Sequence, residues 1–370
     1  MCQDRDGAPP RRGLRSWCPG WRCDRLPDMA TPERRRRERG VALILVLFVV
    51  SLASVLVISL AWSTHLGSRL NSFSERGFQA EYILKSAISF ARVMIQVDKT
   101  PADGEQDLWG RFINGIELPP ALLGITEPNI RVALEIRPEE AKIPLRALVP
   151  VASGPPDEKW RNLLLRFFQQ LKFDEDNEPD HTGLFPDRVF TAGELVATLV
   201  DYMDQDSESY AGEGFAAGSE GELPKDTYAN QRMARVGELS AIPGFTPGRV
   251  RRLTPFVTVF GNNRININIA PEAVLLALHP AITADQVKQI MAFRASDEGP
   301  FTDQNMNEKL TEIIGDDSVY SQIATMISVR GVWFQVLAKV DYGSSTFFMR
   351  AYISRNNLND LPEIRSVELF

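Results

Sequence analysis

A cluster of acidic side chains lies in the middle of the 370-residue sequence, in a segment rich in glycine and serine. The carboxylates of this cluster belong to Asp201, Asp204, Asp206, Glu208 and Glu213. Carboxylate oxygens at such close spacing are ligands that hard cations such as calcium favour. The segment lacks the glycine and the final glutamate of a twelve-residue EF-hand loop. It is therefore either an irregular cation site or a solvated acidic loop.

Residues typical of enzyme active sites are scarce. The three histidines, His65, His181 and His279, lie far apart in the sequence. The sequence has no nucleophile elbow, phosphate-binding loop or His-Glu-x-x-His motif. We therefore expect that the protein is not an enzyme.

Two segments, 239–253 and 271–294, have the pattern of helix-turn-helix units similar to the helix-hairpin-helix motif of DNA-binding proteins. In that motif a Gly-x-Gly turn presents backbone amides to a phosphate. The first turn here reads Gly244-Phe245-Thr246-Pro247, and the second, Pro280 to Ala284, has no glycine. The net charge of −7 also opposes binding to a polyanion. We interpret both units as packing modules, with DNA binding as the alternative.

The sequence predicts strands on both sides of a block of helices that contains the acidic segment. Alternation of apolar and polar residues predicts a strand over 130–137, and amphipathic patterns predict helices over 157–172 and 191–204. Thr191 is the expected N-cap of the second helix. The segments 333–340 and 347–354 flank a turn and predict a hairpin. A helical block thus interrupts one sheet.

The residues from Val41 to Trp62 carry no charge. A helix needs roughly 20 apolar residues to cross a bilayer, so this segment is long enough to span it. It is longer than the apolar region of a secretory signal peptide, and it lacks the polar stripe of a helix on a soluble core. We predict a single membrane span continued by a helix to Val97, with a plain signal anchor as the alternative to a processed one.

A basic segment precedes this span, with five arginines between Arg34 and Arg39. Such residues stay in the cytoplasm, which places the body of the protein on the outer side. The three cysteines, Cys2, Cys18 and Cys23, all precede Gly40. Met29 gives a more typical start for a short leader, so we expect residues 1–28 to be an extension or a mis-assigned start.

The junction Arg39-Gly40-Val41 resembles the processing site of type IV pilins and type II secretion pseudopilins. In that superfamily a prepilin peptidase cuts after the glycine and the new amino terminus is methylated. Most members carry a glutamate at the fifth mature position, which is Leu45 here. Minor pseudopilin K of type II secretion systems lacks that glutamate. The segments that resemble this family more specifically are Glu194 to Asp206, Ile242 to Phe245 and Ile265 to Pro271.

The resemblance implies an α+β fold in which a long pilin-like N-terminal helix packs on an antiparallel sheet. A large all-α domain with the helix-hairpin-helix-like units is inserted into this sheet. The expected divisions are a leader at 1–40, the N-terminal helix at 41–100, the first part of the sheet domain at 101–152, the insertion at 153–325 and the rest of the sheet domain at 326–370.

The resemblance also implies a function and partners. The family forms the tip of a periplasmic fibre that supports protein export, together with other minor pseudopilins, the prepilin peptidase and the inner-membrane secretion platform. The expected location is the inner membrane, single-pass, with a periplasmic C-terminal domain and no nucleic-acid partner. The family binds structural calcium in the inserted domain. We therefore expect the ligands of a calcium ion among Asp201, Asp204, Asp206 and Glu208.

Two alternatives remain for the whole chain. A membrane-anchored DNA receptor would use the hairpin units, which resemble those of small competence-type receptors. A minor type IV pilin would ordinarily keep the glutamate at position 45 and lack so large a helical insertion.

Overall fold

A computed structural model describes residues 34–127, 129–225 and 227–370 of the chain. Met29 and the three cysteines lie outside the described residues. The chain divides into two compact units, the first ending at Asn71 and the second spanning Ser72–Phe370.

The first unit contains the N-terminal part of helix α1, which spans Arg34–Val97. Apolar side chains from Val41 to Trp62 are exposed, with 53–72% of their surface accessible. Exposed apolar surface of this extent is costly in water and favourable in a hydrocarbon environment. Among the described residues, α1 is the one helix long and apolar enough to cross a membrane. It is consistent with a single-pass anchor.

The second unit contains a five-stranded antiparallel sheet in the order β1-β2-β7-β8-β9. The strands are β1 Ile116–Leu118, β2 Ile130–Pro138, β7 Trp333–Tyr342, β8 Ser345–Ser354 and β9 Glu363–Leu369. β7 and β8 form the predicted hairpin, in which Tyr342 pairs with Ser345. Strands β2 and β7, although distant in sequence, are neighbours through nine paired residues.

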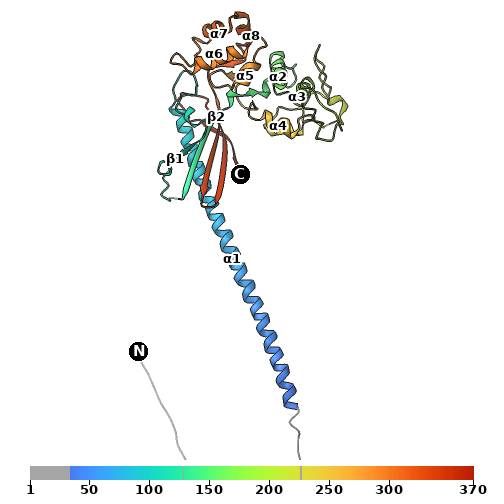
Figure 1. Cartoon of the computed structure of the whole chain (residues 1–370), viewed down its shortest axis with the longest axis vertical. Coiled ribbons are helices and arrows are strands. Elements are labelled where there is room, and N and C mark those ends of the chain that lie inside the picture. The colour runs from blue at the N-terminus through green and yellow to red at the C-terminus, as the bar shows by residue number, and fades with distance from the viewer. Residues whose placement is uncertain (1–33, 128, 226) are drawn as a thin grey trace, which may run out of the picture. The chain divides into compact units, whose positions relative to one another are not determined.

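The C-terminal part of α1 covers one face of this sheet (Figure 1). Its buried side chains recur at helical spacing, and several are alanines, which let the helix approach the strands closely. The buried residues on α1 are Ala80, Leu84, Ala87, Ile88, Ala91 and Ile95. They pack against alternate residues of the central strands such as Val132, Val336 and Ala351. The structure thus confirms the predicted α+β class, with a long helix on an antiparallel sheet.

The segment between β2 and β7 is an inserted, mainly helical domain with its own core. Its helices are α2 Glu158–Gln170, α3 Ala192–Met203, α4 Pro247–Leu253, α5 Glu272–Ala277, α6 Ala284–Arg294, α7 Met306–Ile314 and α8 Asp317–Ile323. Two-stranded parallel pairs join β3 Ile143–Pro144 to β4 Val257–Thr258, and β5 Ile265–Asn266 to β6 Ile327–Ser328. The 3-10 helices of the second unit are η1 Gly110–Phe112, η2 Pro120–Leu123, η3 Glu139–Ala141, η4 Leu145–Ala147, η5 Glu220–Glu222 and η6 Val236–Ala241.

The insertion begins earlier than the sequence indicated. We expected it to start at residue 153, but Ile143, Leu145 and Val149 belong to the core of the helical domain. These apolar residues lie in short turns and in β3, so they pack against helices instead of extending the sheet. Strand β2 therefore ends at Pro138, and η3 begins at Glu139.

Local sequence signals explain where the helices flanking the acidic cluster begin. Asp157 caps α2 by accepting hydrogen bonds from the backbone of Lys159 and Trp160. Thr191 caps α3 and forms a capping box with Glu194. Both caps lie where the sequence predicts the helix starts. Helix α3 ends at Met203, so the acidic cluster follows directly from a rigid element.

Candidate metal centre

Three carboxylates come together at the C-terminal end of α3. One oxygen from each of Asp204, Asp206 and Glu220 lies within 4.8 Å of the others. Asp204 is the C-cap residue of α3, and Glu220 begins the 3-10 helix η5. The loop between these elements therefore returns to its starting point. It forms an oxygen-rich cluster, which we call the Asp204 cluster (Asp204, Asp206, Glu220 and the neighbouring Asn230).

Three oxygens of the Asp204 cluster are buried without any hydrogen-bond donor among the described residues. They are Oδ1 of Asp204, Oε2 of Glu220 and Oδ1 of Asn230. The amide of Asn230 donates from Nδ2 to Glu220 at 2.9 Å, which fixes the side chain in place. An unpaired buried acceptor costs roughly 1–3 kcal/mol. All three are oxygens, which is the ligand type that a hard cation such as calcium prefers.

The electrostatics of the cluster agree with its geometry. Burial raises the pKa of Asp204 from its ordinary value of 3.8 to about 8, and the charges of Asp206, Asp201 and Glu220 add to the effect. Burial is also the main cause of the raised pKa of Glu220. Carboxylates are therefore concentrated here, and within the described part of the chain no lysine or arginine forms an ion pair with Asp204 or Glu220. A divalent cation would reverse both shifts.

Asp201 and Glu208, both predicted as ligands, have other positions. Asp201 is fully buried on α3 and accepts backbone hydrogen bonds from Tyr210, Ser219 and Glu220 at 2.6–2.9 Å. Its carboxylate thus closes the loop and holds Glu220 against α3. The backbone amide of Glu208 donates to Asp206 at 3.0 Å, but the Glu208 side chain is not part of the cluster. The structure therefore unites Asp204 and Asp206 with Glu220, which the sequence reasoning missed.

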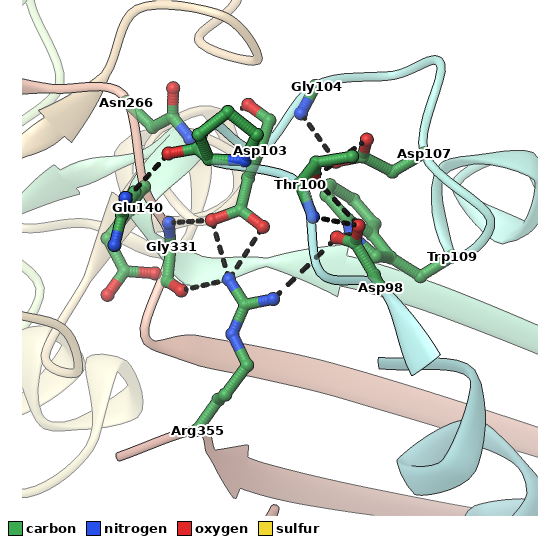
Figure 2. A network of polar contacts seen from close by, with 12 residues as sticks. Asp98, Thr100, Asp103, Gly104, Asp107, Trp109, Glu140, Asn266, Gly331 and Arg355 are labelled. Carbon is green, nitrogen blue, oxygen red and sulfur yellow. Dashed lines mark hydrogen bonds and ion pairs between the residues drawn. The ribbon is translucent and has the colours of Figure 1, made fainter. Parts of the chain in front are cut away.

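A second group of carboxylates, Asp98, Asp103 and Asp107, lies at the end of α1. Figure 2 shows the guanidinium of Arg355 between Asp98 and Asp103. Its Nη2 donates to both oxygens of Asp103 at 2.6 Å, and its Nη1 lies 3.7 Å from Asp98. Asp98 also accepts from the Trp109 indole at 3.0 Å.

The two groups of carboxylates differ in whether the chain itself supplies hydrogen-bond donors to them. Asp107 accepts from the Gly104 amide at 2.8 Å, and Asp103 accepts from the Gly331 amide at 2.6 Å. Donors of the chain, including a cation, thus already satisfy this group (Figure 2). The backbone of Asp103 also accepts from Asn266 at 3.2 Å. The Asp98–Asp103–Asp107–Arg355 network therefore joins α1, the sheet and the insertion. Of these two groups, the Asp204 cluster is the one whose buried oxygens lack donors among the residues that the structure describes.

In the first hairpin unit, the turn that would bind a phosphate already donates its hydrogen bonds to carboxylates of the chain. The Gly244 amide, in the turn between η6 and α4, donates to Asp180 at 2.9 Å, and the Thr246 hydroxyl donates to Glu178. Arg249 on α4 is fully buried and bonds to Asp176 at 2.5 Å. The acidic segment 176–180 thus occupies the place that a nucleic-acid phosphate would take. In the second unit the Thr283 amide donates to Gln286 at 2.8 Å, within a capping box.

The residues of the predicted processing site all lie on α1. Gly40 is inside the helix, and Val41 and Leu45 are 65% and 61% exposed. Nothing within 4 Å would meet a Cβ added at Gly40. Packing within the described chain therefore does not require glycine at this position.

Comparison with known proteins bears on the insertion. Residues 141–262 match the family described as "Type II secretion system (T2SS), protein K". We call residues 141–262, which match this family, the protein K domain. This match confirms the resemblance drawn from the sequence. The Asp204 cluster lies entirely inside this protein K domain, and so does the first hairpin unit.

Two similar proteins extend the comparison beyond the protein K domain. The "Putative type II secretion system protein K" of Escherichia coli (strain K12) is 24% identical over 238 residues, which is 63% of this chain and 65% of that protein. The match thus spans slightly less than two thirds of the relative. The crystal structure of the GspK-GspI-GspJ complex from the type 2 secretion system of enterotoxigenic Escherichia coli is similar in fold. It has a TM-score of 0.61 and 18% identity, over 81% of this chain and 99% of the matched chain.

Proposed function

We propose that this chain is a minor pseudopilin of a type II secretion system, located at the tip of the fibre that supports protein export across the outer membrane. The observation that carries the proposal is a protein K domain inserted in a pilin-like sheet behind a helix of membrane-spanning length. Its role is structural assembly, not catalysis.

The tip position is supported by Leu45. In a fibre of this kind a glutamate at the fifth mature position neutralises the terminal amine of the subunit ahead. Leu45 offers no charge, which suits a subunit with none ahead of it. The partners in this proposal are other minor pseudopilins, counterparts of the GspI and GspJ named with the similar structure.

Membrane anchoring and processing complete the proposal. The apolar part of α1 holds the chain in the inner membrane, with its C-terminal domain in the periplasm. The prepilin peptidase cuts after Gly40, Val41 becomes the methylated terminus, and the secretion platform extracts the subunit into the fibre. Calcium in the Asp204 cluster stabilises the loop of the protein K domain.

DNA uptake is the alternative function and has less support. Carboxylates of the chain occupy the turn of the first hairpin, and the chain carries a net charge of −7. A salt-dependent mobility shift with duplex DNA at physiological ionic strength would favour it.

Co-expression with the two pseudopilins corresponding to GspI and GspJ tests the function. We expect a stable complex of three different chains in size-exclusion chromatography. Leu45→Glu should leave secretion intact, because the tip subunit has no terminal amine to neutralise. Failure to form the complex would contradict the partner assignment, and a complete loss of secretion with Leu45→Glu would contradict the tip position.

A further inference from the structure

Strand β9 is the C-terminal edge of the sheet, and its outer side is unpaired within the described residues. Phe370 and Phe348 exchange two backbone hydrogen bonds of 3.0 Å, so this pair is of the hydrogen-bonded type. Hydrogen-bonded and non-hydrogen-bonded pairs alternate along an antiparallel ladder, so the pair of Glu368 with Arg350 is also hydrogen-bonded. The backbone N–H and C=O groups of Glu368 therefore point toward β8. The backbone N–H and C=O groups of Val367 and Leu369 therefore point away from the sheet.

The C-terminal part of this edge exposes apolar side chains, and the strand is long. Val367 and Leu369 are 47% and 55% exposed, and the opposite edge, β1, has only three residues. Edge strands are commonly protected by charged side chains or proline. The exposed ion pair of Arg365 with Glu363, at 2.6 Å, lies in the N-terminal part of β9, and Glu368 pairs with Arg350 of β8 at 3.3 Å. The part of the edge that is open to another strand is therefore its C-terminal part, at Val367 and Leu369.

A hollow of about 480 Å³ lies beside this edge, between the sheet and the protein K domain. Ser366 and Glu368 line it from β9, and Arg235 lines it from the insertion. Its charged lining residues are Glu139, Lys142, Arg235, Arg350 and Glu368. Lys142 is paired with Glu139 at 2.7 Å and Arg350 is paired with Glu368. The guanidinium of Arg235 has no carboxylate partner among the described residues, so the hollow carries one uncompensated positive charge.

We propose that β9 accepts an extended segment of a partner protein as a sixth strand, and that an acidic side chain of this segment enters the hollow beside Arg235. Main-chain hydrogen bonds to Val367 and Leu369 supply affinity in this mode of recognition. Alternate side chains of the added strand supply specificity. One face of that strand lies on the side of Ser366 and Glu368, where the hollow is.

A second copy of this chain fits the edge less well. If the β9 strand of a second copy were the added strand, the carboxylate that it could offer to the hollow is that of its Glu368. This carboxylate is already paired with Arg350 of the same copy. A partner with a free acidic residue is the occupant that complements Arg235.

Binding of synthetic peptides to the full-length chain in detergent micelles tests this inference. The probe is an array of nine-residue peptides of alternating threonine and valine, with glutamate, lysine or serine at one position. We expect the glutamate peptides to bind. Arg235→Glu should weaken them at least about fivefold, since a close charge pair contributes on the order of 1 kcal/mol or more. Arg131→Glu, at an exposed arginine on β2, is the control and should leave binding unchanged.

The backbone contact needs its own test. Val367→Pro removes a backbone N–H that points away from the sheet, and edge strands tolerate proline at such positions. The variant should fold but lose peptide binding. In the unaltered chain, hydrogen exchange should slow at Val367 and Leu369 when peptide is added, whereas Glu368 should already be protected. Equal binding of glutamate and lysine peptides, or unchanged exchange at Val367, would overturn the proposal. A peptide-independent dimer lost with Val367→Pro would assign the edge to a second copy and overturn it too.

Discussion

Nη2 of Arg355 donates to both carboxylate oxygens of Asp103 at 2.6 Å, although 252 positions separate the two residues. Arg355 follows the last residue of β8, and Asp103 follows α1. The contact therefore ties the end of the pilin-like helix to the end of the sheet. Asp98 and Asp107 lie in the same buried group.

Arg355→Met should destabilise the fold by about 3–5 kcal/mol, because it leaves buried carboxylates without their cation. Denaturant unfolding in detergent measures the loss. Arg131→Met is the matched control, since Arg131 is 70% exposed and lies 3.8 Å from Asp341. Exposed pairs contribute at most about 1 kcal/mol. Similar losses in both variants would show that the buried network adds no special stability.

Glu140 makes the stability of the fold depend on pH. It is buried beside the backbone of Trp333, and burial raises its pKa from the ordinary 4.5 to about 7. The folded state therefore holds a proton that the unfolded chain has released between pH 4.5 and 7, and stability falls as pH rises through this window. In Glu140→Gln this part of the slope should disappear. Unfolding free energies of both proteins at matched pH values test this, and identical slopes would contradict it.

Calcium should raise the melting temperature of the chain, and chelator should lower it. At 100 times the dissociation constant the gain is about 2.7 kcal/mol. Glu220→Gln should abolish the calcium response, because Oε2 of Glu220 is one of the buried oxygens without a donor. Glu208→Gln is the control in the same loop and should keep the response. The reverse result would favour the ligand set predicted from the sequence.

Gly40→Ala should block removal of the leader, because the proposed peptidase recognises the glycine and the fold does not need it. Mass spectrometry of the chain co-expressed with the prepilin peptidase measures the outcome. The unaltered chain should begin at a methylated Val41, whereas the variant should keep residues up to position 40. Normal cleavage of the variant would remove the processing site from the proposal.

Much of the fold could be predicted from local signals. The alternation over 130–137, the cap at Thr191 and the turn before Ser345 each specify their element through neighbouring residues. Strand β9 escaped prediction because the sheet register shifts between Tyr352 and Ile353. Residues 364, 367 and 369 therefore lose the period of two that marks a strand.

The metal candidate could be predicted only in part, for a different reason. Asp204 and Asp206 are neighbours in sequence, so their spacing shows them together. Glu220 joins them because Asp201 gathers the amides of the returning loop. Asn230 contributes an oxygen from still further along the chain. The carboxylate of Asp201 brings Glu220 close to Asp204 through tertiary hydrogen bonds, and the spacing of residues in the sequence does not reveal such contacts.

The pairing of Pro138 with Phe334 has a consequence for how this architecture can vary. The helical domain leaves the sheet at the end of β2 and returns at the start of β7, and adjacent strands lie about 5 Å apart. Its two attachment points therefore have the spacing of an ordinary hairpin, whatever lies between them. Related chains can enlarge, shorten or exchange this module while the register of the sheet stays fixed. A change in the length of the helical domain therefore need not alter the strand pairing of the sheet, provided that the contact of Asn266 with Asp103 is kept.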